Sequence, residues 1–530
     1  MIKLLISRSK KTFLKSACFV ILLSGMQIIL PISMRWMISF TEEKQSYIVL
    51  TICIFGYAIL LLINNFVHIG WTYSLDWLGG EILEGIRMDL YDAILKADYK
   101  ELLKIGKEKL KNILYMDTLN IFQSVSVQGM QIISNIFLIF IFLLVSFFIN
   151  QWLSLVLLLS SILGFFLSMA SRKPIAAASM KVNLKMKEDN KVTNEYIDAM
   201  ELLKTNELEY YFREKGKSSL WDFIHTALRA DKILVFLKQM ITDFHQLVSV
   251  GISAFLAMSM RDTVTAGDLV YYIFVTDMIL NTSQAIETGL YSLIRMLPAF
   301  ENITKILHLK ETKGTEILSS IDTISFKNVS FYYENNQKSI INNLSAEFKT
   351  GDIIRIAGEN GSGKSTFIKL LVGLLHPETG EICFNGIPIH ELSSSCLKKQ
   401  IIYINQDEII LNDTVNNYLK AISDLELEDE TIEALKNKVK FDKEIVTVRE
   451  NGNSLSGGQR KKMLLMKLLL RYQGASVIIL DEIEAGLDLE SKEFVIELEK
   501  EILSNRKNCI IFKITHEEKI GFYNKVIQMS

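Results

Sequence analysis

A short stretch at residues 358–366 has the composition and spacing of a phosphate-binding loop. The stretch reads GENGSGKST, and its Gly358, Gly363, Lys364 and Ser365 fit the pattern G-x-x-x-x-G-K-[ST]. Glycines let main-chain N–H groups close around phosphate, the lysine reaches the outer phosphates, and the serine hydroxyl can bind magnesium. A strand-like run, IIRIAG, precedes the loop and a helix-like run, STFIKLLVGLL, follows it, which is the context that the motif requires.

A second stretch ends in two carboxylates. SVIILDE (476–482) reads as an apolar strand that ends at Asp481 and Glu482. The carboxyl ends of strands are where an open α/β sheet holds its chemistry. Asp481 can hold the magnesium shell, and Glu482 can orient or activate the attacking water. Alone, such a pair is more often an ordinary strand end, but beside a phosphate loop it predicts a nucleotide hydrolase.

A third stretch also suits an anion. NSLSGGQRKK (453–462) is a turn of small residues that opens onto a helical run, and helix N-termini attract phosphate. One nucleotide needs only one phosphate loop, so this turn requires a separate explanation.

The order of these motifs resembles the ATP-binding cassette of ABC transporters. The phosphate loop is followed by INQDE, LSGGQ at 455–459, IILDE, AGLD at 485–488 and ITHE. In this family the LSGGQ turn faces the ATP that a second cassette holds. The resemblance therefore implies a dimer, and both a homodimer and a heterodimer remain open. The hydrophobic segments ahead of the cassette resemble an exporter half-transporter.

The resemblance also implies roles for individual residues. Tyr333 is expected to stack on adenine, Gln406 to couple the nucleotide to the membrane helices, His516 to contact the γ-phosphate, and Asp488 to join the two sites. The expected cofactors are ATP and Mg²⁺. The expected catalytic residues are Glu482, His516 and Gln406; the metal ligands are Ser365, Gln406 and Asp481; and the ATP-binding residues are Tyr333, Gly358, Asn360, Gly361, Ser362, Gly363, Lys364, Ser365, Thr366, Ser456, Gly457, Gly458, Gln459 and Asp488.

The cassette departs from the family pattern at several positions. Ala485 and Gly486 stand where a Ser-Ala pair is usual, Glu408 takes a common proline position, and RKKMLLMKLLL lacks much of the usual arginine and alanine pattern. None of these changes removes an expected ligand of phosphate, magnesium or water, so we expect active hydrolysis. Regions near 98–106 and 200–212 resemble the coupling helices of exporters.

The first part of the chain is hydrophobic enough to cross a membrane. Hydrophobic residues make up 49% of the sequence, and a helix needs about 20 apolar residues to span a bilayer. Short connections alternate with long ones rich in Lys and Arg, which predicts a multi-pass protein of a plasma membrane with both termini in the cytoplasm. The abundance of Lys, Ile and Asn is typical of an AT-rich bacterial genome, so we expect a bacterial membrane. We expect six spans, at roughly 13–38, 47–75, 118–149, 152–171, 233–260 and 265–297.

These elements define the expected fold class. It combines an α-helical membrane domain of six long transmembrane helices (1–298), a linker (299–320) and an α/β P-loop ATP-binding cassette domain (321–530). The formal net charge of −2 gives no support for binding nucleic acid.

Polar residues on the sixth expected span recur every three or four positions, so they share one face of a helix. An ionisable group such as Asp277 is costly in lipid and is by default part of a cavity or pathway. The alternative is hydrogen bonding between packed spans. The expected cavity residues are Asp277, Asn281, Gln284, Glu287 and Thr288 here, with Asp243 and His245 on the fifth span.

The expected function is ATP-driven export of a small amphipathic cargo by an alternating-access homodimer. A peptide, a bacteriocin-like molecule or a drug-like molecule would fit an acidic cavity. The alternative is a membrane-bound ATPase that senses a ligand or gates a partner without moving cargo. The expected partners are a second copy of the chain, membrane lipid and the cargo.

Overall fold

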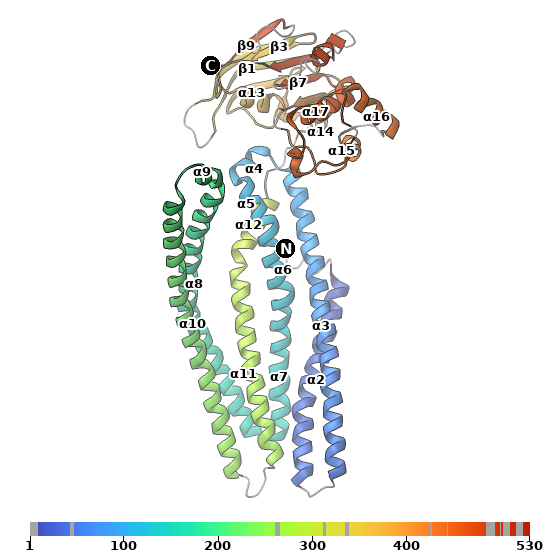
Figure 1. The fold of residues 1–530 in the computed structure, drawn as a ribbon. Coiled ribbons are helices and arrows are strands. Elements are labelled where there is room, and N and C mark those ends of the chain that lie inside the picture. Colours follow the sequence, from blue (N-terminus) through green and yellow to red (C-terminus); the bar gives the residue numbers. More distant parts are fainter. Residues whose placement is uncertain are drawn as a thin grey trace. The chain divides into compact units, whose positions relative to one another are not determined.

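The computed structural model describes most of the chain and divides it into two compact units (Figure 1). One unit comprises Met1–Asp92 and Glu108–Leu307, and the other comprises Ala93–Lys107 and His308–Ser530. The described residues are 9–42, 47–259, 265–310, 314–333, 339–405, 408–423, 427–442, 444–483, 493–498, 500–501, 509–515 and 523–529.

The first unit is helical, with long helices joined by a few short ones. They are α2 (Lys10–Glu42), α3 (Tyr47–Lys96), α5 (Lys107–Asn112), α6 (Thr118–Phe122), α7 (Met130–Ile149), α8 (Gln151–Asp198), α9 (Met200–Thr205), α10 (Glu209–Ser259), α11 (Ala266–Arg295) and α12 (Leu297–Leu307). Two π-helical segments, η1 (Ile113–Asp117) and η2 (Gln123–Gly129), join α5, α6 and α7 into one helical run. The predicted linker at 299–320 begins inside α12, where Ile303 and Ile306 are buried.

The six predicted spans coincide with helical segments, except that residue 260 of the fifth lies outside the described residues and the sixth runs past both ends of α11 to Leu297, the first residue of α12. Among the described residues, four helical stretches are long and apolar enough to cross a membrane: Lys10–Phe40, Tyr47–Lys96, Lys107–Ile149 and Gln151–Asp198. The fifth and sixth spans lie in α10 and α11, which carry more polar side chains. The first unit is therefore a helical transmembrane domain.

A buried cluster packs the helices of this domain together near the turn between α7 and α8. α11 packs against α2, α7 and α10, and α8 packs along α10. Phe142, Tyr271 and Tyr272 are fully buried in this cluster. The Tyr272 hydroxyl donates a 3.1 Å hydrogen bond to the carbonyl of Ser146, which satisfies the polar end of an otherwise apolar side chain.

Two sheets form the framework of the second unit. An antiparallel sheet has the order β2-β1-β4-β5, and a parallel sheet has the order β6-β7-β8-β3-β9. The strands are β1 (Thr323–Phe331), β2 (Ile341–Lys349), β3 (Ile353–Ala357), β4 (Thr379–Phe384), β5 (Ile387–Pro388), β6 (Ile401–Ile404), β7 (Val477–Asp481), β8 (Ile510–Ile514) and β9 (Lys525–Gln528).

Short helices accompany these sheets. They are α4 (Tyr99–Ile105), α13 (Lys364–Leu371), α14 (Ser394–Gln400), α15 (Val415–Ile422), α16 (Asp429–Lys438) and α17 (Gly457–Arg471), with single turns η3 (Ile389–Glu391), η4 (Glu450–Gly452) and η5 (Tyr472–Gly474).

The parallel sheet brings distant segments to one edge. Strands β6, β7, β8 and β3 run in the same direction, so their carboxyl ends meet where an open α/β sheet binds ligands. The segments that leave this edge begin at Gly358, Asn405, Glu482 and Thr515. All five residues of β8 are buried, as expected for a strand covered on both faces.

Helix α4 belongs to the same unit as the sheets, although it comes from the first quarter of the chain. Asp98 caps the helix by accepting a 2.8 Å hydrogen bond from the Lys100 main chain. Tyr99 packs against the apolar core around the sheets, and Lys100 forms an ion pair with Glu378. The main-chain N–H of Asp98 also donates to the Lys310 carbonyl at 2.9 Å.

Candidate nucleotide site

The phosphate loop has the backbone that its glycines were expected to provide. Gly358, Gly361 and Gly363 have φ angles of 154°, 84° and 96°, in the region that side chains strongly disfavour. Gly363 is the N-cap of α13, so the first N–H groups of that helix point into the loop. A Cβ at Gly363 would lie 2.9 Å from the Ile340 side chain, which leaves no room for a larger residue.

Two polar groups of the loop suit an anionic ligand. The Lys364 ammonium donates to the main-chain carbonyls of Gly358 at 2.8 Å and Glu359 at 3.1 Å, so the cation lies folded over its own loop. The Ser362 hydroxyl is buried and has no hydrogen-bond partner among the described residues. A buried polar atom without a partner normally indicates a missing ligand or water, and a nucleotide phosphate is a fitting one.

Tyr333 lies next to the first helix after the loop. Its hydroxyl is 3.5 Å from that of Thr366, and its ring meets the ring of Phe331 edge-on at 5.0 Å. The ring is half-buried. The structure therefore brings Tyr333, the expected adenine contact, together with the phosphate loop.

The two expected carboxylates occupy the neighbouring strand end. Asp481 is the last residue of β7 and accepts a 3.2 Å hydrogen bond from the Tyr403 hydroxyl. Glu482 follows with a φ of 50°, and its main-chain N–H donates to the Ile514 carbonyl at 3.1 Å. The described residues contain no group of three or more possible metal-ligating side chains, and magnesium commonly takes one or two carboxylates plus substrate phosphates.

Sequence reasoning missed Tyr403. Its hydroxyl meets Asp481 because β6 and β7 are paired with Tyr403 opposite Ile479, two residues before the aspartate. The only local signal is a tyrosine in the otherwise aliphatic run IIYI. That signal does not identify the partner strand.

The LSGGQ turn opens a helix of 15 residues, α17. Ser456 caps it by accepting from the Gln459 main-chain N–H at 3.3 Å, while the Gln459 side chain accepts from the Ser456 main-chain N–H at 2.8 Å. Ser456 and Gly457 are exposed, and a Cβ at Gly457 or Gly458 would meet nothing within 4 Å. The turn is therefore an open, pre-formed helix N-terminus.

Basic side chains of α17 contact segments near the carboxylates. Lys467 forms an ion pair with Glu408 and donates to the Tyr403 carbonyl at 3.2 Å, while Arg460 donates to the Glu408 carbonyl at 2.8 Å. Burial and the nearby Glu408 carboxylate raise the pKa of Tyr418 above its usual value. The two departures from the family pattern, Glu408 and the lysine-rich helix, are thus partners of each other.

Three expected site residues fall outside the described part of the chain. They are Gln406, Asp488 and His516, together with the Ala485-Gly486 pair. Their assignments stay predictions. Asn360 and Ser365 are exposed residues at the loop and the start of α13.

The expected cavity residues lie on exposed and half-buried faces of α10 and α11. Asp277, Asn281, Thr288 and Asp243 are exposed, whereas Gln284 and Glu287 are half-buried. Asn281 donates to the Asp277 carboxylate at 3.1 Å, and Asp243 accepts from Gln239 at 2.8 Å. The side chain of His245 lies outside the described part.

Gln284 makes a hydrogen bond between packed helices, which is the alternative to a cavity role. It donates to the Thr242 hydroxyl of α10 at 3.1 Å, which is a hydrogen bond between packed helices. The polar stripe therefore combines a bond between helices with exposed side chains.

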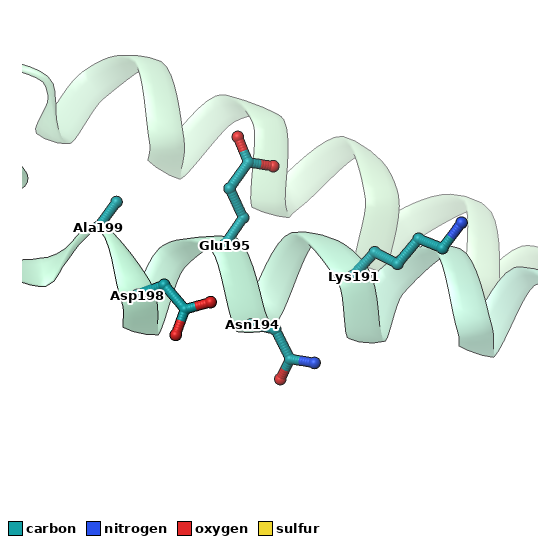
Figure 2. A pocket seen from close by; sticks show the side chains of 5 residues that line it. All are labelled: Lys191, Asn194, Glu195, Asp198 and Ala199. Carbon is teal, nitrogen blue, oxygen red and sulfur yellow. The ribbon is translucent and has the colours of Figure 1, made fainter. Parts of the chain in front are cut away.

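A separate hollow lies in the helical unit, beside the end of α8. It has a volume of about 490 Å³ and is lined by Lys191, Asn194, Glu195, Asp198 and Ala199 (Figure 2). Glu195 points toward the neighbouring helix (Figure 2), where it pairs with Lys215 of α10 at 2.7 Å. This hollow contains none of the expected site residues.

Comparisons with known proteins agree with this architecture. Residues 13–283 match the model of the ABC transporter transmembrane region, and residues 341–485 match that of the ABC transporter. An ATP-dependent lipid A-core flippase of Methylococcus capsulatus is 25% identical over 484 residues, covering 87% of this chain and 78% of the relative. A flippase of the same name from Pseudoalteromonas translucida is 26% identical over 472 residues, covering 83% and 78%.

A solved structure shares the fold. The chain has a TM-score of 0.80 to the structure of a bacterial Atm1-family ABC exporter with ATP bound, with 15% sequence identity and coverage of 98% of this chain and 93% of that one. The transmembrane match alone takes in more than half of the 530 residues. The chain therefore belongs to the ABC transporters, as a multi-pass half-transporter of the exporter type that hydrolyses ATP with Mg²⁺.

Proposed function

We propose that the chain exports a lipid-like amphiphile across a bacterial plasma membrane as a homodimer, with both termini in the cytoplasm. The observation that carries this proposal is that one chain holds a phosphate loop and a carboxylate pair at one sheet edge together with a helical membrane domain that has exposed polar groups on α11. Export needs both an energy source and a polar path through an apolar domain.

The proposed chemistry is phosphoryl transfer to water. Bound ATP with Mg²⁺ would supply the γ-phosphoryl group. Lys364 and the main chain of the loop would hold the phosphates, Ser365 and Asp481 would hold the metal, and Glu482 would orient the attacking water. Tyr403 would keep the Asp481 carboxylate in place through its 3.2 Å hydrogen bond.

The open helix N-terminus supports the proposed homodimer. A Cβ at Gly457 or Gly458 would meet nothing within 4 Å, Ser456 is exposed, and the N-terminus of a 15-residue helix favours anions. This second anion-binding turn would close the nucleotide held by the partner copy. A complete phosphate loop and carboxylate pair in the chain is what two equivalent sites require.

Two observations bear on the cargo. The relatives carry the name lipid A-core flippase, which favours an amphiphile taken from the membrane. The exposed carboxylates Asp277 and Asp243 favour a cationic group instead, so a cationic amphipathic peptide is the second candidate. A phosphorylated lipid would have to keep its anionic groups away from these carboxylates.

Transport in reconstituted vesicles tests the proposal. Purified protein would be reconstituted into vesicles, and ATP with Mg²⁺ would be added outside. One set of vesicles would carry fluorescent lipid A-core in the membrane, and a second set would report the uptake of a cationic amphipathic peptide into the lumen. We expect movement of the lipid that needs ATP and is absent with Glu482→Gln. Movement of the peptide alone would favour the second candidate. ATP hydrolysis that responds to ligands but moves neither cargo would favour a sensing or gating ATPase.

A further inference from the structure

The helix that follows the LSGGQ turn reaches the carboxylate end of the same chain. The Lys461 ammonium donates to the main-chain carbonyl of Glu482 at 3.3 Å. Lys461 lies one turn into α17, only five residues after Ser456. The turn at Ser456 is proposed to serve the partner's nucleotide, and Glu482 is proposed to serve the nucleotide of its own chain. Lys461 connects the two positions.

Glu482 is held in an unusual backbone conformation. Its φ of 50° lies in the left-handed region, which is unfavourable for a non-glycine residue and persists only where the surroundings enforce it. Two bonds do so here: the N–H of Glu482 donates to Ile514 at 3.1 Å, and its carbonyl accepts from Lys461. The first bond belongs to the sheet edge, and the second comes from α17.

The same helix is fixed nearby by a second set of contacts. Arg460 and Lys467 are seven residues apart, so they lie two turns apart on one face of α17. Both bind Glu408, one through its carbonyl and the other through its carboxylate. These contacts tie α17 to the segment at Glu408 on both sides of Lys461 in the sequence.

We propose that Lys461 is a positioning residue for ATP hydrolysis: it fixes the main chain of Glu482 and so links the signature turn to the catalytic carboxylate of its own chain. This inference rests on the proposed role of Glu482. A lysine on a helix surface is more often simply hydrated, but Lys461 is half-buried and its ammonium meets a carbonyl on the residue proposed to orient water.

Substitution of Lys461 tests the proposal, and the adjacent lysine is a matched control. Lys462 follows on the same helix, and its ammonium donates to the Lys440 carbonyl at 2.9 Å. We expect Lys461→Met to lower kcat of ATP hydrolysis at least about tenfold with little change in ATP affinity, because small misplacements of a reacting group are costly. Lys461→Arg should recover most of the activity, and Lys462→Met should keep wild-type kcat.

Several results would overturn it. They are a Lys461→Met kcat within twofold of wild type, an equal loss in Lys462→Met, or a loss that Lys461→Arg does not recover while the melting temperature falls. The Glu482→Gln variant distinguishes a failure of the role of Lys461 from a failure of the proposed role of Glu482. If Glu482→Gln keeps wild-type turnover, the role of Glu482 is wrong; if Glu482→Gln is inactive but Lys461→Met is not, only the role of Lys461 is wrong.

Mixed dimers decide on which site Lys461 acts. In a dimer of one Lys364→Ala chain and one Ser456→Arg chain, the only intact site uses the phosphate loop and Glu482 of the Ser456→Arg chain and the LSGGQ turn of the other. Lys461→Met should abolish most of the remaining activity when placed in the Ser456→Arg chain and have little effect in the Lys364→Ala chain. The opposite pattern would show that Lys461 serves the LSGGQ turn instead.

Discussion

The Tyr403 hydroxyl donates a 3.2 Å hydrogen bond to the Asp481 carboxylate and joins the ends of two neighbouring strands at the nucleotide edge of the sheet. Hydrogen bonds to a charged group contribute about 1.5–3 kcal/mol. This bond restricts the orientation of the side chain that is proposed to hold magnesium.

Tyr403→Phe should therefore weaken the use of the metal. We expect the Mg²⁺ concentration for half-maximal ATP hydrolysis to rise severalfold, and kcat/KM at low Mg²⁺ to fall about tenfold, as a loss of about 1.4 kcal/mol implies. A magnesium titration of the ATPase activity measures both. Tyr472→Phe, at another buried tyrosine of the same unit, is the control, and an unchanged titration in Tyr403→Phe would show that the hydroxyl has no part in metal binding.

Glu482→Gln should separate binding from turnover. The amide keeps the size of the side chain but cannot act as a base, so we expect ATP binding to survive while turnover falls roughly a hundredfold or more. Equilibrium binding of a labelled ATP and steady-state hydrolysis on the same sample test this. Turnover near that of wild type would refute the assignment.

Shared sites predict complementation between two inactive chains. Ser456→Arg blocks the open turn and Lys364→Ala removes the cation of the phosphate loop, but a mixed dimer retains one site free of both lesions. We expect hydrolysis in mixed dimers, isolated with two affinity tags, well above that of either mutant homodimer. Activity no higher than in the homodimers would mean that sites are not shared or that neither works without the other.

The parts of the site that are contiguous in sequence could be predicted, and the parts that depend on pairing of distant segments could not. The phosphate loop and the Asp481-Glu482 pair each lie within a few residues of their strand, so a local pattern specifies them. The Glu408–Lys467 ion pair joins residues 59 positions apart. Sequence reasoning noted both as departures from the family, but no local rule shows that one departure contacts the other.

In the membrane domain too, local patterns could be predicted and contacts between distant segments could not. The spacing places Asp277, Asn281 and Thr288 on one face of α11, and all three are exposed; their place in a cargo cavity stays a prediction. The bond from Gln284 to Thr242 of α10 could not be predicted, because periodicity gives the face of a helix and not the depth or the neighbour of each residue on it.

Cysteine labelling tests the polar face directly. Cysteines replacing Asn281 or Thr288, which are exposed, should react with a water-soluble thiol reagent, whereas cysteines replacing Thr282 or Ile286, which are buried, should react more slowly. ATP should change the reactivity at 281 and 288 if this face lines an alternating cavity. Equal labelling at all four positions would contradict a polar face that meets water.

Asp277→Asn tests the charge on that face. The Asp277 carboxylate is exposed and accepts a 3.1 Å hydrogen bond from Asn281, so we expect the Asp277→Asn protein to fold normally. We expect severalfold weaker stimulation of ATP hydrolysis by a cationic amphiphile, with stimulation by a neutral one unchanged. Unchanged stimulation by the cationic compound would show that the charge of Asp277 does not select the cargo, but it would not contradict the polar face.

Because helix α4 belongs to the same compact unit as the sheets, that unit consists of two separate segments of the sequence. Tyr99 is half-buried and packs against the cassette's apolar core, Asp98 donates its main-chain N–H to the Lys310 carbonyl, and Lys100 pairs with Glu378. A fragment comprising only residues 308–530 would leave that apolar seat open to water and lose two polar anchors. The compact unit that holds the candidate nucleotide site is therefore discontinuous in the sequence, and a fragment that keeps all of its contacts has to include residues 93–107 as a tethered or added peptide.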